Sequence, residues 1–152
     1  MFGKRLSEYV GFEWALLLIV ALVGLARLIL SIAELPDSVV RWLSMNAVVW
    51  AGTIYCGIAV HRRGFGSYKQ LLPLELLQVV VFQAIAVLGI LLAIAGVPNI
   101  FAAPEYSPIH SQWLHALTHA TLGVAVSSLL LWGAASLVLL ITRAVARQRA
   151  VA

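Results

Sequence analysis

The sequence predicts an all-α integral membrane protein, a four-transmembrane-helix bundle in which a single transmembrane domain takes up residues 1–152. Hydrophobic residues make up 62% of the chain and charged residues 11%. Soluble domains are about half apolar and about a quarter charged, so this composition argues against a soluble fold. Four long apolar runs support the same conclusion, at residues 12–33, 39–60, 74–95 and 113–141.

The length of each run fits a membrane-spanning helix. The first three runs have 22 residues each. A helix of that length is about 33 Å long, enough to cross a hydrocarbon core of about 30 Å. The fourth run has 29 residues, so we expect its first turns to extend into the interface. The runs lack the alternation of barrel strands, which favours helices.

The basic residues predict the orientation. With four spans, the lysines and arginines of the N-terminal segment, of the connection after the second span and of the tail 142–152 share one side. Basic residues favour the cytoplasmic side, so both termini are predicted to be cytoplasmic. The pattern suits a multi-pass protein of a bacterial cytoplasmic membrane. A cleaved signal peptide ending near Ser31-Ile32-Ala33 is the alternative, but Arg27 interrupts its apolar region.

The sequence also suggests a duplicated helical hairpin. Residues 31–37 (SIAELPD) align with residues 93–99 (AIAGVPN), and each segment closes a span with a proline. The same register places Glu13 opposite Glu75. The outer loop 96–112 would then hold an insertion specific to the second copy. The alternative is chance recurrence of common apolar residues.

Polar residues inside the spans are candidate sites, because they are costly in a bilayer. Arg27 either lines a polar cavity or extends to the outer interface, toward Glu34. Glu13 and Glu75 either serve a transporter or lie at the interface near helix N-termini. The deeper amides Gln78, Gln83 and Asn46 are expected to join helices by hydrogen bonds.

The histidines form the one chemical pattern in the chain. His115 and His119 share a helix face because they are four residues apart, and Glu105 and His110 precede them on the outer loop. Such a set suits Zn or Cu. Haem is disfavoured, because two histidines one turn apart cannot ligate opposite faces of one haem. The alternative is a pair of polar interface residues without metal.

No catalytic motif is present, and the single cysteine excludes an intramolecular disulfide and a Cys-cluster metal site. We therefore expect a non-enzymatic scaffold, accessory subunit or oligomer component that contacts lipid and a partner membrane protein or further copies. A metal- or redox-related protein and a small transporter with a polar path near Arg27, Glu75 and Gln78 are the alternatives. Nucleic acid is not an expected partner. Anionic lipid is a candidate partner of the tail arginines Arg143, Arg147 and Arg149.

Overall fold

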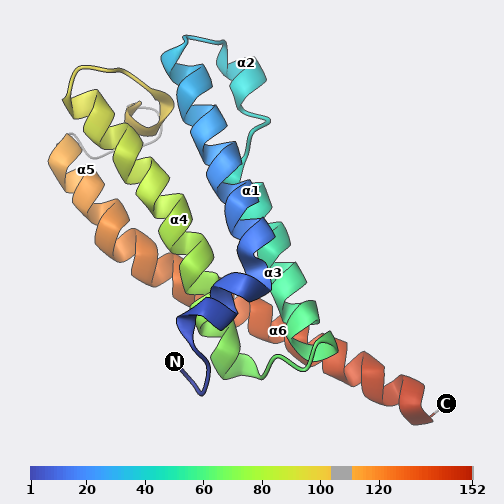
Figure 1. Ribbon diagram of the computed structural model, residues 1–152. Coiled ribbons are helices and arrows are strands. Elements are labelled where there is room, and N and C mark those ends of the chain that lie inside the picture. Colours follow the sequence, from blue (N-terminus) through green and yellow to red (C-terminus); the bar gives the residue numbers. More distant parts are fainter. Residues whose placement is uncertain (104–110, 152) are drawn as a thin grey trace.

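A computed structural model describes residues 1–103 and 111–151, and within them every regular element is helical (Figure 1). The elements are α1 (Leu6–Ile32), α2 (Asp37–Val40), α3 (Met45–Arg62), α4 (Tyr68–Ile94), η1 (Ile100–Ala102), α5 (Gln112–Thr118), η3 (His119–Gly123) and α6 (Val124–Val151). η3 is one turn of π-helix, so α5, η3 and α6 form one continuous helix.

Three helical stretches have the length and the apolar composition needed to span a bilayer: α1, α4 and Gln112–Arg149. They are consistent with a multi-pass membrane protein. The other long helix, α3, has 18 residues. By helical rise it measures about 27 Å, slightly less than a hydrocarbon core of about 30 Å. Large apolar side chains point outward from the bundle, as lipid contact requires; Trp42 is 79% exposed and Trp113 66%.

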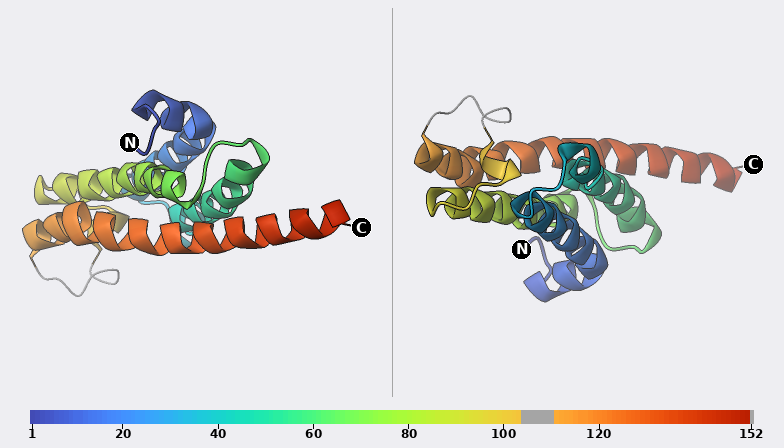
Figure 2. Two further views of the ribbon diagram at one scale, coloured as in Figure 1. Left: turned by 90° about the horizontal axis from the view of Figure 1, so that it is seen from below. Right: turned by 90° about the horizontal axis from the view of Figure 1, so that it is seen from above.

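The long helices alternate in direction. α1 and α4 run one way, and α3 and the α5–α6 helix run the other (Figure 1). Both termini therefore lie toward the same end, and α6 extends well past the other helices there (Figure 2). α4 contacts α1, α3, α5 and α6, which makes it the central helix.

The second helix begins later than the predicted run 39–60. The short helix α2 ends at Val40, and α3 starts only at Met45. Ser44 is the N-cap of α3, and its hydroxyl accepts a hydrogen bond from the Ala47 amide at 3.2 Å. Such a cap satisfies one of the free amides of a new helix, so it fixes this start. Arg27 Nη1 supports the break by donating to the Leu43 carbonyl at 3.3 Å.

α3 and α6 approach each other closely at Gly57. A Cβ atom there would lie 2.7 Å from Val138 Cβ and 2.8 Å from the Ala135 carbonyl oxygen. Small residues permit such close backbone contact between membrane helices. One buried apolar cluster lies beside this crossing, made of Tyr9, Cys56, Val60, Leu71, Leu74, Ala135 and Leu139.

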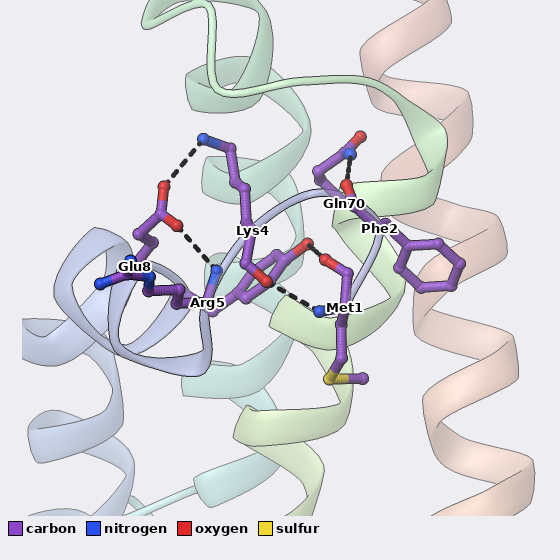
Figure 3. A network of polar contacts seen from close by, with 7 residues as sticks. Met1, Phe2, Lys4, Arg5, Glu8 and Gln70 are labelled. Atoms are coloured by element: carbon purple, nitrogen blue, oxygen red, sulfur yellow. Dashed lines mark hydrogen bonds and ion pairs between the residues drawn. The ribbon is translucent and has the colours of Figure 1, made fainter.

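The N-terminal segment folds back onto the start of α4 (Figure 3). Gln70 Nε2 donates to the Phe2 carbonyl at 2.9 Å, and the Tyr9 hydroxyl donates to the Met1 carbonyl at 3.0 Å. Lys4 and Glu8 form an ion pair at 3.3 Å on the surface. Exposed pairs of this kind add little stability, so the buried Tyr9 is the main anchor of this segment.

The turns that end α1 and α4 are alike. At the end of α1, the Leu35 amide donates to the Leu30 carbonyl at 3.1 Å, and Glu34 has a φ of 57°. At the end of α4, the Val97 amide donates to the Leu92 carbonyl at 2.9 Å, and Gly96 has a φ of 93°. These are left-handed C-terminal turns at corresponding positions of the two aligned segments. The duplication itself stays a prediction.

Candidate functional site

A group of polar side chains lies inside the bundle where α1, α3 and α4 meet. It comprises Glu13, Thr53, Cys56, Glu75 and Gln78, and we call it the carboxyl cluster. Each of its members is at most 2% exposed. Both glutamates lie well within their helices, because α1 begins at Leu6 and α4 at Tyr68, earlier than the apolar runs 12–33 and 74–95. Each carboxyl is therefore about two turns inside its helix.

Glu13 lies at a kink in α1. Its φ of −126° and ψ of 17° depart from helical values. Glu13 Oε2 accepts a hydrogen bond from Gln78 Nε2 at 3.0 Å. The Cys56 thiol donates weakly to the same oxygen, with its sulfur 3.7 Å away. The kink thus presents one carboxylate oxygen to donors from two neighbouring helices.

Glu75 pairs with Thr53 across α3 and α4. Thr53 Oγ1 lies 2.8 Å from Glu75 Oε2 and 3.0 Å from the carbonyl oxygen of Val49. A hydroxyl has one hydrogen to donate. If Thr53 donates to Val49, as helix hydroxyls commonly do, the Glu75 contact requires a hydrogen on the carboxyl itself. This contact can therefore report whether Glu75 holds a proton.

Three oxygens of the carboxyl cluster are buried without a hydrogen-bond partner: Glu13 Oε1, Glu75 Oε1 and Gln78 Oε1. In the described part of the chain, the one ion pair is that of Lys4 with Glu8, so neither buried glutamate has a cation partner there. Burying an unpaired polar group or charge is costly. The cluster therefore has unused capacity to bind protons, water or a small cation.

One member of the cluster borders a cavity. A cavity of about 380 Å³ between α1 and α3 is lined by residues that include Glu13, Tyr55 and Arg63. The Arg63 guanidinium stacks on Tyr55, 5.6 Å from the ring centroid, and on Phe12, at 5.3 Å. Arg63 follows directly after α3, at the end of the bundle that holds both termini (Figure 1). The cavity thus has Glu13 and Arg63 in its lining, together with side chains such as Trp14 and Ile19 on the outer surface of α1.

A second polar group lies on α4, α5 and η3. His119 Nδ1 is 2.6 Å from Gln83 Oε1, and His119 Nε2 is 3.1 Å from His115 Nε2. An amide oxygen only accepts, so His119 Nδ1 carries a hydrogen. In a neutral pair, His115 Nε2 then donates to His119 Nε2. His115 Nδ1 then carries no hydrogen and has a free lone pair, and this atom is buried without a hydrogen-bond partner.

The predicted metal ligands are brought together in part. His115 and His119 lie side by side on the predicted helix face, with their Nε2 atoms 3.1 Å apart. The described residues contain no group of three or more His, Cys, Asp or Glu side chains that could hold a metal ion. Glu105 and His110 lie outside the described residues, so the predicted site of four residues stays a prediction.

The other polar candidates lie apart from the carboxyl cluster. Arg27 donates to the Leu43 carbonyl near the α2–α3 break, and among the described residues it forms no ion pair with Glu34. Asn46 lines a cavity of about 130 Å³ together with Gln83 and Ser127. As expected, Gln78 and Gln83 each join two helices through a hydrogen bond.

The sequence did not indicate Thr53 and Cys56 as functional. Each has a small residue four positions away, Gly57 and Gly52, and small residues at that spacing are typical of helix contacts. Their spacing of three residues on α3 was the available signal, since it places a hydroxyl and a thiol on one face.

Comparison with models of protein families found no match, and comparisons with curated proteins and with solved structures also found none.

Proposed function

We propose that this chain is a small proton transporter with four membrane spans, in which Glu13 and Glu75 take up and release protons. The observation that carries the proposal is the carboxyl cluster. It holds two buried glutamates that have no cation partner in the described residues, each hydrogen-bonded to a neighbouring helix. Ionisable residues within a bilayer generally mark ion or proton pathways. A carboxylic acid needs no counter-ion and a carboxylate does, so each proton transfer changes the forces between these helices.

The cavity beside Glu13 supports a route for protons from one side. We assign that side to the cytoplasm, because the basic residues of the N-terminal segment, the α3–α4 connection and the end of α6 gather there. In this arrangement α3 is the fourth span, and its short length is compatible with a locally thinned bilayer. The membrane is the bacterial cytoplasmic membrane. Arg27 is not part of this path, since it lies 14 residues along α1 from Glu13, about 21 Å by helical rise.

Proton flux into vesicles tests this function. The full chain is reconstituted into liposomes that contain a pH-sensitive dye, and a potassium diffusion potential drives proton entry. We expect flux with the wild-type protein, and flux at the level of empty vesicles with Glu13→Gln or Glu75→Gln. Glu8→Gln is the matched control, because Glu8 lies on α1 but is exposed, so its flux stays at the wild-type level.

Wild-type flux equal to that of empty vesicles would overturn the transport proposal. The expected role as scaffold, accessory subunit or oligomer component would then be the better account. Proteins that co-purify with the chain would identify the assembly. Equal loss of flux in all three variants would also contradict the proposal, since it would not depend on the buried carboxyls.

The histidine pair favours a second candidate function, the binding of Zn or Cu at the outer end. Two Nε2 atoms 3.1 Å apart are close to the separation of neighbouring ligands around a metal with Zn–N bonds of about 2.0–2.1 Å. The contact of His119 with Gln83 is the kind of outer hydrogen bond that orients a ligating histidine. Such a metal would replace the shared hydrogen of the neutral pair.

Metal analysis of the purified protein tests this second function. We expect stoichiometric Zn or Cu that is lost in a His115→Ala/His119→Ala double variant and kept in His61→Ala, a histidine near the opposite end of the bundle. Absence of both metals in the folded wild-type protein would contradict it. A visible haem spectrum would contradict the expectation that no haem is bound.

A further inference from the structure

The two helices that cross at Gly57 separate toward the end of the bundle that holds both termini. From the contact of Gly57 with Ala135 and Val138, α3 continues only to Arg62, whereas α6 continues to Val151 (Figures 1 and 2). The last turns of α3 and the extending part of α6 together line a surface cavity, which we call the groove.

This groove has an apolar part and a basic part. A cavity of about 560 Å³ is lined by apolar side chains of Ile58, Ile141 and Val145 and by the basic side chains of Arg62 and Arg149. Arg62 and Arg149 come near the ends of their helices, whereas Ile58 and Ile141 lie deeper in the bundle. The cavity is thus apolar toward the middle of the bundle and basic toward its end.

A second cavity continues the basic part. It measures about 390 Å³ and is lined by His61, Arg143, Ala146 and Arg147, so His61 and Ala146 border both cavities. Arg143 is held in place, because its Nη2 donates to the Gly66 carbonyl at 3.4 Å and its guanidinium lies 5.0 Å from the Tyr68 ring centroid. In the described residues, no acidic side chain pairs with these arginines. The groove therefore presents uncompensated positive charge.

We propose that this groove binds an anionic phospholipid, with Arg62 and Arg149 on its phosphate group and the side chains of Ile58, Ile141 and Val145 along an acyl chain. Guanidinium groups bind phosphate oxygens through two parallel hydrogen bonds, which makes arginine suited to this headgroup. Basic groups near a membrane surface also attract anionic lipids. The inference does not depend on proton transport, since the groove and the carboxyl cluster share no residue.

Lipid retention tests the proposal. The full chain is reconstituted into vesicles of equal parts phosphatidylglycerol and phosphatidylcholine and extracted in mild detergent, and the bound lipids are counted by mass spectrometry. We expect phosphatidylglycerol to be enriched in the wild type. In the double variant Arg62→Gln/Arg149→Gln, the enrichment should fall by about fivefold or more. A fivefold change is roughly the contribution of one surface cation to anionic-lipid binding.

The matched control is Arg5→Gln/Lys69→Gln, which removes the same charge from exposed positions at the same end but outside the groove. Its enrichment should stay at the wild-type level. Equal loss in the control would overturn the groove as a site, because total charge would then explain the binding. Unchanged enrichment in the Arg62→Gln/Arg149→Gln variant would overturn it as well.

Two further arms make the result specific. Arg62→Lys/Arg149→Lys keeps the charge, so it should retain part of the enrichment and show that the two positions tolerate substitution. Inorganic phosphate added to the extract should not release the lipid. Release by inorganic phosphate would show a phosphate site that a free anion fills, which overturns the assignment to a lipid.

Discussion

Glu13 and Glu75 lie at corresponding positions of two equally long helices. α1 and α4 have 27 residues each, and each glutamate is the eighth residue of its helix. Both carboxyls are buried in the same carboxyl cluster, and both helices end in the same type of left-handed turn. Each helix is also irregular near its glutamate: α1 is kinked at Glu13, and α4 contains Pro73 two residues before Glu75. The correspondence fits the predicted duplication and gives the cluster its two carboxyls.

The hydroxyl of Thr53 should stabilise the buried Glu75. Thr53→Val keeps the shape of the side chain but leaves Glu75 Oε2 without its hydrogen bond, so we expect a loss of about 1–3 kcal/mol. Thermal unfolding in detergent measures it. Thr142→Val is the control, because within the described residues Thr142 Oγ1 bonds the Val138 carbonyl of its own helix, at 2.8 Å, and no other group. Similar losses in both variants would show that the hydrogen bond with Glu75 adds no more stability than a hydroxyl bonded within its own helix.

The crossing of α3 and α6 should be sensitive to a single methyl group. Gly57→Ala forces a Cβ against Ala135 and Val138, and overpacking of this kind costs about 1–3 kcal/mol. Gly133 on α6 has open space around its Cα, so Gly133→Ala should instead stabilise the helix by about 0.5–1 kcal/mol. Unfolding midpoints of the two variants should move in opposite directions. A stable Gly57→Ala variant would contradict the close approach of these helices.

The two left-handed turns predict a reciprocal pair of substitutions. Glu34 has a φ of 57° without being glycine, a conformation that costs a side-chain residue about 1–2 kcal/mol. Glu34→Gly should therefore stabilise the protein by up to that amount, and Gly96→Ala should destabilise it, since Gly96 has a φ of 93°. Thermal unfolding of both variants checks this. Loss of stability in Glu34→Gly would show that a contact of the glutamate side chain stabilises the protein by more than the backbone conformation costs.

Much of the architecture follows from local sequence signals. The long apolar runs and the prolines after α1 and α4 predicted the helices and the ends of two of them. The break before α3 was not predictable, because it depends on the Ser44 cap and on Arg27, which reaches Leu43 from another helix. A polar contact between distant segments leaves no local pattern.

The sequence identified several residues of the carboxyl cluster, but it did not predict how they are arranged in space. Glu13, Glu75 and Gln78 were candidates because ionisable and amide groups are rare in apolar spans. Their burial was missed, since α1 and α4 start earlier than the apolar runs and carry the carboxyls deeper. The pairing of His115 with His119 followed from their helical spacing, whereas the contact of His119 with Gln83 required the packing of α5 and η3 against α4.

The most direct test of the central claim is an infrared titration of the full chain in lipid vesicles, which detects the C=O stretching band of a carboxylic acid as pH is changed. A buried Glu13 that exchanges protons through its cavity predicts a reversible carboxylic acid band that is lost in Glu13→Gln and kept in Glu8→Gln. A spectrum in which Glu13→Gln removes no pH-dependent band would contradict proton binding at Glu13, and with it the proposed transport.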